Sequence, residues 1–167
     1  KLLPPPVQPT TMSGQSPAIS IPRQLFTLSW PVLVAQAAVM AGARFAVSPG
    51  YTRSVGQACR DLGLALLPGV ATGSEIMMAQ EDGLTQLKFF PAMQAGGAAM
   101  LKAWSGPFFD VKFCPTGGVT LLNASEFLAL PNVVCVGGSW LVPADAMVKG
   151  EWNKITQLAK DTQALRK

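Results

Sequence analysis

The sequence contains no histidine, and this absence narrows the chemistry that it can perform. Without an imidazole, Ser-His-Asp triads and the usual His-containing zinc sites are excluded. Acidic residues are also unevenly placed, since no Asp or Glu precedes Asp61. Lysine and the few carboxylates are therefore the main candidates for nucleophilic and proton-transfer roles.

Charge is scarce as well: 13% of the residues are charged, and the net charge is +4. The basic residues of the first half are scattered singly, without aromatic residues between them. A nucleic-acid surface gathers its basic residues into a patch, so we expect no nucleic-acid partner. A small anionic substrate accounts better for a mild positive bias.

Long apolar runs and paired cysteines are missing too. The longest apolar run, residues 32–43, is interrupted by Gln36 and is shorter than the roughly 20 residues of a membrane span. Residues 1–20 lack a signal-peptide core, and the cysteines, Cys59, Cys114 and Cys135, are odd in number and widely spaced. We expect a reduced cytoplasmic protein without a membrane contact, in which Cys114 and Cys135 are small apolar side chains of buried strands.

What the sequence does contain is an alternation of helical and strand patterns. Residues 1–31 show no assignable element, and from residue 32 onward strands recur about every 20 to 24 residues, the length of one αβ unit. The expected helices lie at 32–40, 52–62, 72–80, 97–104, 125–130 and 151–165, the third capped by Thr72 or Ser74. The expected strands lie at 44–48, 64–67, 87–90, 110–114 and 133–136.

These strands are apolar throughout, as in a parallel sheet covered on both faces, so the fold class is α/β. An open doubly wound sheet and a closed (β/α)₈ barrel (TIM barrel) both fit this pattern. Each strand ends in a Pro or Gly turn, and the richest glycine turns follow the last two strands. Barrel enzymes often bind phosphate there, which favours a single barrel domain over residues 1–167 with Lys88 on its sixth strand.

Lys88 interrupts the apolar run Leu87 to Pro91. Alternation along a strand places Lys88 and Phe90 on one face, and Leu87 and Phe89 on the other. A lysine with apolar neighbours loses hydration, which suits it to attack a carbonyl and form a Schiff base. On this segment alone, a lysine that extends from the strand end to water is an equally good interpretation.

Two glycine turns offer an anion site. Pro115-Thr116-Gly117-Gly118 and Gly137-Gly138-Ser139 follow neighbouring strands and present backbone N–H groups and hydroxyls. Each turn alone is a weak signal, because tight turns use glycine for other reasons. Together, on adjacent terminal strands, they favour phosphate binding.

These motifs also carry a family resemblance. Residues 87–92, 113–118 and 135–145, with Phe45 to Gly50 and Leu67-Pro68-Gly69, resemble the 2-keto-3-deoxy-6-phosphogluconate aldolase family over approximately residues 32–167. That segment would match the second half to two-thirds of the barrel. The resemblance implies a homotrimeric class I aldolase that needs no metal or cofactor. Its substrate would be a phosphorylated keto acid, cleaved to pyruvate and glyceraldehyde 3-phosphate, and 4-hydroxy-2-oxoglutarate would be a second substrate.

The same resemblance assigns roles to residues. It implies that Lys88 is the catalytic Schiff-base lysine. Substrate contacts would come from Pro49, Phe90 and Thr116, and phosphate contacts from Gly117, Gly118, Gly138 and Ser139. The family's early strand with its glutamate base and carboxylate-binding arginine has no counterpart in this sequence, because residues 1–31 contain no acid. We therefore assign no general base.

Other interpretations stay open. Lys112 also interrupts an apolar strand and is a rival nucleophile, although a charge-pairing or positioning role fits it better. Glu75, Glu81 and Asp82 are expected on the outer side of a helix. A phosphate-binding barrel isomerase or epimerase would use the same glycine turns, and a barrel fragment without its base would be inactive.

Overall fold

The computed structural model describes residues 30–165. The prediction that the first 31 residues contain no assignable element therefore lies, for residues 1–29, outside the described part of the chain. In chain order the elements are α1 (Trp30–Met40), β1 (Phe45–Val47), α2 (Arg53–Asp61), β2 (Ala65–Leu67), β3 (Gly69–Val70), α3 (Gly73–Glu81), β4 (Gln86–Phe89), α4 (Gly97–Trp104), β5 (Lys112–Pro115), α5 (Ala124–Leu128), η2 (Ser139–Leu141), α6 (Ala144–Lys149), α7 (Trp152–Asp161) and η3 (Thr162–Leu165). None of the helices in this part of the chain is both long and apolar enough to cross a bilayer.

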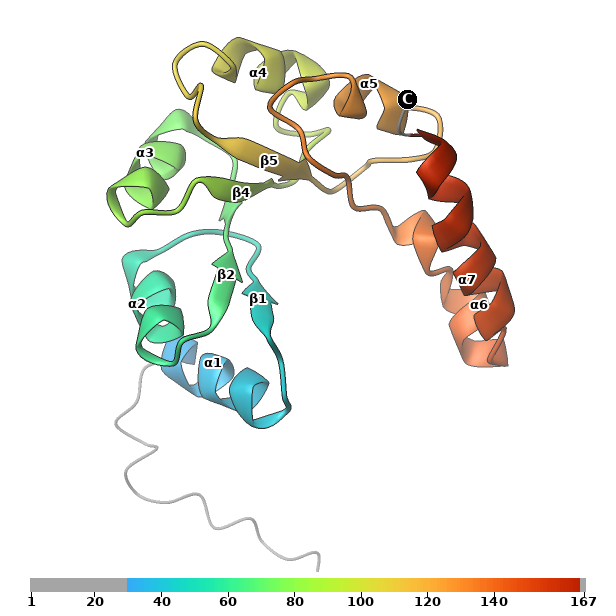
Figure 1. Cartoon of the computed structure of the whole chain (residues 1–167), viewed down its shortest axis with the longest axis horizontal. Coiled ribbons are helices and arrows are strands. Elements are labelled where there is room, and N and C mark those ends of the chain that lie inside the picture. Colours follow the sequence, from blue (N-terminus) through green and yellow to red (C-terminus); the bar gives the residue numbers. More distant parts are fainter. Residues whose placement is uncertain (1–29, 166–167) are drawn as a thin grey trace, which may run out of the picture.

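All strand pairs are parallel, and neighbours in space follow the chain order (Figure 1). Strand β1 pairs with β2, and β3, β4 and β5 form a second sheet. Only Pro68 separates β2 from β3, and its carbonyl accepts a hydrogen bond from the Lys88 N–H at 2.8 Å. The segment 65–70 therefore joins the two sheets: its first half, β2, pairs with β1, and its second half, β3, pairs with β4.

This order bears on the fold class. A doubly wound sheet reverses its strand order at a switch point, and the strands of residues 30–165 show no reversal. Helices α2 to α5 line the outer side of the curved row of strands in Figure 1. The α/β class with parallel strands is confirmed, whereas the described strands do not close on themselves, and a complete barrel stays a prediction.

Helix α3 shows how the local sequence fixes the element boundaries. Thr72, rather than Ser74, is its N-cap, because the Thr72 hydroxyl accepts from the Glu75 N–H while the Glu75 carboxylate accepts from the Thr72 N–H. The helix ends before Gly83, whose φ of +79° favours glycine. The carboxylate of Glu75 is thus committed to the helix start.

The core lies between β3 to β5 and the helices that cover them. Leu87, Phe89 and Phe113 are fully buried. The Trp104 ring packs edge-on against Phe89 with 5.2 Å between centroids and lies 5.7 Å from Phe113. Burial of four large side chains with Leu101 fixes the outer face of β4, and so directs the side chains of its other face inward.

Some sequence expectations were wrong. Residues 133–136 form no strand: single parallel bridges join Phe113 to Val133 and Thr116 to Gly137. Pro68-Gly69 was predicted to be a turn that ends a strand, but the chain continues directly from β2 into β3 there. Proline has no N–H to donate, yet its carbonyl can still accept a hydrogen bond from the neighbouring strand. The last predicted helix is α7 followed by the short η3, and α6 was not expected.

Candidate active site

Lys88 lies on the inner face of β4, as its alternation with Leu87 and Phe89 predicts. Its side chain is half-buried, and Nζ lies 4.4 Å from the centroid of the Phe90 ring. The aromatic face attracts the ammonium and holds it on this side of the strand. The sequence left an extension to bulk water open, and the contact with Phe90 favours the inward position.

A pocket of about 340 Å³ opens beside Lys88. The predicted residues that line it are Lys88, Phe90, Thr116, Gly117, Gly118, Gly138 and Ser139. They come from the ends of β4 and β5 and from the segment after Val133, which the parallel order brings to one edge. Of the predicted site residues, only Pro49 is not part of this lining.

The two glycine turns adopt shapes that a side chain would disturb. Gly117 and Gly118 have φ of +94° and +75°. A Cβ on Gly118 would also lie 2.7 Å from the Met93 side chain. At the second turn, a Cβ on Gly138 would lie 2.5 Å from Cδ1 of Trp140. Both turns therefore depend on glycine for their shape and close packing.

These turns present hydrogen-bonding groups that the protein leaves unused. Within residues 30–165, the backbone N–H groups of Gly117, Gly118, Gly138 and Ser139 donate no hydrogen bond. The Thr116 hydroxyl is buried and also lacks a partner there. Because a buried polar group without a partner costs free energy, this arrangement is suited to a bound polar or anionic group.

Sequence reasoning missed one prominent lining residue. Trp140 borders the pocket, packs against Gly138, and carries a buried indole N–H without a partner within the described chain. An aromatic residue next to a Gly-Gly-Ser turn was the available signal. The short η2 helix folds it back onto the turn, which no periodic pattern predicts.

Pro49 occupies a neighbouring position. It is exposed, its carbonyl packs against Gly69, and Gly69 pairs with Lys88 across β3 and β4. It lines a separate, largely apolar pocket of about 430 Å³ beside α1. Pro49 is thus one strand away from Lys88, and its expected substrate contact stays a prediction.

The rival lysine is placed differently. Lys112 is exposed at the start of β5, and its ammonium donates to the Pro131 carbonyl at 3.1 Å. It does not line the Lys88 pocket. Among residues 30–165 it also forms no ion pair with a carboxylate, so neither the pairing role nor a position at the imine is supported.

The carboxylates near the site are engaged elsewhere. Glu81 forms an exposed ion pair with Arg53, and Asp82 accepts a hydrogen bond from the Tyr51 hydroxyl. With Glu75 at the start of α3, all three lie on the helical side, as expected. No Asp or Glu of the described chain lines the Lys88 pocket, which agrees with the missing acid motif.

Cys114 lies beside Lys88, with which it is paired in register across β4 and β5. A hydrogen bond with the Cys135 thiol and burial raise the pKa of Cys114, while the positive charge of Lys88 acts in the opposite direction. Cys135 is exposed, so the expectation of a buried apolar thiol was wrong there: the segment around it is not a covered strand.

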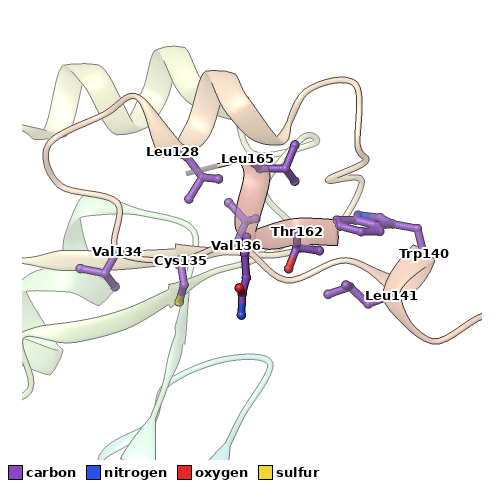
Figure 2. A pocket seen from close by; sticks show the side chains of 9 residues that line it. Leu128, Val134, Cys135, Val136, Trp140, Leu141, Thr162 and Leu165 are labelled. Atoms are coloured by element: carbon purple, nitrogen blue, oxygen red, sulfur yellow. The ribbon is translucent and has the colours of Figure 1, made fainter. Parts of the chain in front are cut away.

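A third pocket, of about 410 Å³, lies beside the segment that carries Cys135. It is bordered by α5, η2 and η3 (Figure 2), and its lining is mostly apolar, with Leu128, Val136 and Leu165 among its residues. It contains no lysine or acid. Its chemistry therefore offers packing rather than catalysis.

A family model, curated relatives and solved structures all relate this chain to the same family. The sequence model of a family described as KDPG and KHG aldolase matches residues 31–158. A 2-dehydro-3-deoxy-phosphogluconate aldolase of Pseudoalteromonas atlantica is 51% identical over 124 residues, which are 74% of this chain and 58% of that protein. The chain thus spans less than two thirds of the length of that relative.

Solved structures agree. A KDPG aldolase from Legionella pneumophila, described with pyruvate captured as a covalent carbinolamine, is 53% identical with a TM-score of 0.71, over 74% of this chain and 60% of that one. The Zymomonas mobilis 2-keto-3-deoxy-6-phosphogluconate aldolase with 3-phosphoglycerate is 42% identical with a TM-score of 0.74, over 81% and 64%. The similarity therefore includes both the sequence and the arrangement of the elements.

Proposed function

The chain belongs to the KDPG and KHG aldolase family, and from this premise we propose that it acts as a class I aldolase with Lys88 as its Schiff-base residue. The substrate is 2-keto-3-deoxy-6-phosphogluconate, cleaved to pyruvate and glyceraldehyde 3-phosphate. The observation that carries the proposal is the position of the Lys88 amine beside Phe90, in a pocket bordered by two glycine turns with unused N–H groups.

The reaction follows from the chemistry of an amine nucleophile. Neutral Lys88 attacks the C2 ketone, and loss of water from the carbinolamine gives a protonated imine. The imine accepts the electron pair of the C3–C4 bond as that bond breaks, which leaves an enamine. Protonation of the enamine and hydrolysis release pyruvate. A base must remove the C4 hydroxyl proton, and no carboxylate of the described residues is placed to do so.

The residues around Lys88 have separable roles in this proposal. Thr116 hydrogen-bonds the substrate with its buried hydroxyl, and Phe90 packs beside the pyruvyl carbons. Gly117, Gly118, Gly138 and Ser139 bind the phosphate through their N–H groups. The proposal of a phosphate site is supported by the Zymomonas mobilis structure, which is described with 3-phosphoglycerate. Pro49 contacts the pyruvyl end from the loop that follows β1.

The wider properties are proposed on the same basis. The parallel strands in chain order support a (β/α)₈ barrel, for which the family relationship is the main argument. The family description also names KHG, which supports cleavage of 4-hydroxy-2-oxoglutarate. A homotrimer in the cytoplasm without metal or cofactor completes the proposal.

The test is release of pyruvate from the phosphorylated keto-deoxy acid, followed with a coupled lactate dehydrogenase reaction. We expect turnover by the unmodified protein, loss of it in Lys88→Arg, and retention in the matched control Lys112→Arg. Turnover that survives Lys88→Arg but not Lys112→Arg would contradict the assignment. Phosphate binding without any cleavage would favour an isomerase or epimerase instead.

A further inference from the structure

Cys114 and Cys135 form a thiol pair next to Lys88. Cys114 is in register with Lys88, and both side chains lie on the same face of the sheet. The bridges from Phe113 to Val133 and from Thr116 to Gly137 bracket the two cysteines. Three residue steps on β5 face four on the other segment between these bridges, so the register shifts by one residue; extended from the Thr116–Gly137 bridge, it places Cys135 opposite Cys114.

The view of the neighbouring segment agrees with this placement. In Figure 2 the Cys135 sulfur points away from Leu128 and Leu165, which lie on the helical side. The thiols of Cys114 and Cys135 share a hydrogen bond. A disulfide requires Cα atoms roughly 4.4–6.8 Å apart, and the parallel bridges on either side of the two cysteines hold the two segments together there. The pair thus has the contact that a disulfide requires.

The two thiols differ in access. Cys135 is exposed and can meet a small oxidant from solvent, whereas Cys114 is half-buried behind it. The hydrogen bond with Cys135, and then burial, raise the pKa of Cys114, so this thiol holds its proton more firmly. An exposed attacking thiol with a resolving thiol behind it is the arrangement of an oxidisable pair.

We propose that Cys114 and Cys135 are a peroxide-sensitive modification site, at which a reversible disulfide forms beside Lys88. The Cys135 thiolate attacks one peroxide oxygen, the O–O bond breaks, and hydroxide leaves to give a sulfenic acid. The Cys114 sulfur then attacks the sulfenic sulfur, and the S–O bond breaks with transfer of the Cys114 proton to the leaving oxygen. Hydrogen peroxide is reduced to water as two thiols are oxidised to one disulfide.

The disulfide changes the site through the chain that it tethers. Cys135 lies two residues before Gly137, so a covalent link to Cys114 moves the segment that carries the Gly138-Ser139 turn and alters the surroundings of Lys88. A displacement of about 1 Å in a catalytic arrangement can cost on the order of 10²-fold in rate. This consequence rests on the proposed aldolase function, whereas formation of the disulfide does not.

The experiment treats the full chain with hydrogen peroxide, blocks remaining thiols with an alkylating reagent, and maps the peptides. We expect the peptides carrying Cys114 and Cys135 to be linked, and the link to disappear on addition of dithiothreitol. Cys135→Ser, an exposed substitution, abolishes the link. Cys59→Ala, in the separate cluster under α1 and α2, leaves it unchanged. Two alkylated thiols at these positions after peroxide would overturn the proposal.

Imine formation is measured on the same samples with pyruvate and borohydride. We expect trapping at Lys88 to be at least about tenfold slower in the oxidised protein and restored by dithiothreitol. Equal trapping in both states would overturn the effect on the site. If the reduced protein traps no pyruvate, the aldolase function fails instead, while the peptide map still decides whether the disulfide exists.

Discussion

The region that carries Lys88 is packed very differently from the first αβ unit. In β4 and β5, Leu87, Phe89 and Phe113 are fully buried against Trp104. In β1, Phe45 is 63% exposed and Val47 is 49% exposed, and the cluster under α1 and α2 is built mainly of small residues. The lysine and the glycine turns therefore depend on the packing of the second region, while the first unit mainly places Pro49.

The largest expected effect of this difference is on stability. Phe113→Ala should lower the free energy of unfolding by about 3 to 5 kcal/mol, because it opens a cavity in a fully buried aromatic cluster. Phe45→Ala, at an exposed position of β1, should change it by about 1 kcal/mol or less. Urea denaturation followed by circular dichroism measures both. Similar losses for the two variants would remove the contrast between the regions.

The next effect separates the phosphate turn from the lysine. Gly138→Ala should displace Trp140 and disturb the turn, which raises the KM for the phosphorylated substrate about 10- to 100-fold, equivalent to losing one or two charge-assisted hydrogen bonds. Trapping of pyruvate, which carries no phosphate, should be unchanged. Gly106→Ala is the matched control, since no atom lies near its Cβ position. Equal losses in both assays would argue against a phosphate-specific role.

Thr116 allows activity and stability to be separated. Thr116→Val removes a buried hydroxyl that has no partner within residues 30–165, so it should stabilise the fold by about 1 kcal/mol. The same change should lower kcat/KM about tenfold, because the substrate loses that hydrogen bond. Thermal unfolding and steady-state kinetics check the two effects, with exposed Thr85→Val as the control. A less stable and fully active variant would contradict both expectations.

The smallest effect concerns the Tyr51–Asp82 contact between the loop before α2 and the end of α3. Tyr51→Phe removes this hydrogen bond and should cost about 1 kcal/mol at neutral pH. Burial first, and then the hydrogen bond, raises the pKa of Tyr51 above 10.0. Since the folded state keeps the phenol proton longer, this stabilisation is complete below pH 10.0 and is lost as the pH rises through the folded pKa.

The difference between unmodified protein and Tyr51→Phe in urea denaturation should therefore shrink as the pH rises above 10.0. A difference that grows with pH would have the wrong sign.

Local patterns predicted much of the fold. Apolar runs bounded by Gly and Pro located β1, β2, β4 and β5, and α4 lies at the predicted residues 97–104. The prediction of a strand at residues 133–136 was wrong. An apolar run becomes a strand only where a neighbouring strand supplies a continuous ladder of hydrogen bonds, and here only single bridges form. Strand β3 was missed because Pro68 was interpreted as a strand end, although its carbonyl still accepts a hydrogen bond.

The site was predictable to different degrees. The orientation of Lys88 follows from alternation within one strand, which is a local property. The convergence of Thr116 with Gly138 depends on parallel strands whose ends meet at one edge. The two glycine turns on neighbouring strands already indicated it, and the family resemblance added the roles of the individual residues. The offset of Pro49 arises from chain folding over longer distances. The contact of Trp140 with Gly138, two residues earlier, comes from the short η2 helix, which no periodic pattern predicts.

Borohydride trapping of the protein with pyruvate shows directly whether Lys88 is the Schiff-base nucleophile. After digestion, we predict one reduced adduct, on the peptide that carries Lys88, and none on the peptide that carries Lys112. Lys88→Arg should yield no adduct, while Lys112→Arg should yield the same adduct as the unmodified protein. An adduct on Lys112, or none on Lys88, would show that Lys88 is not the nucleophile.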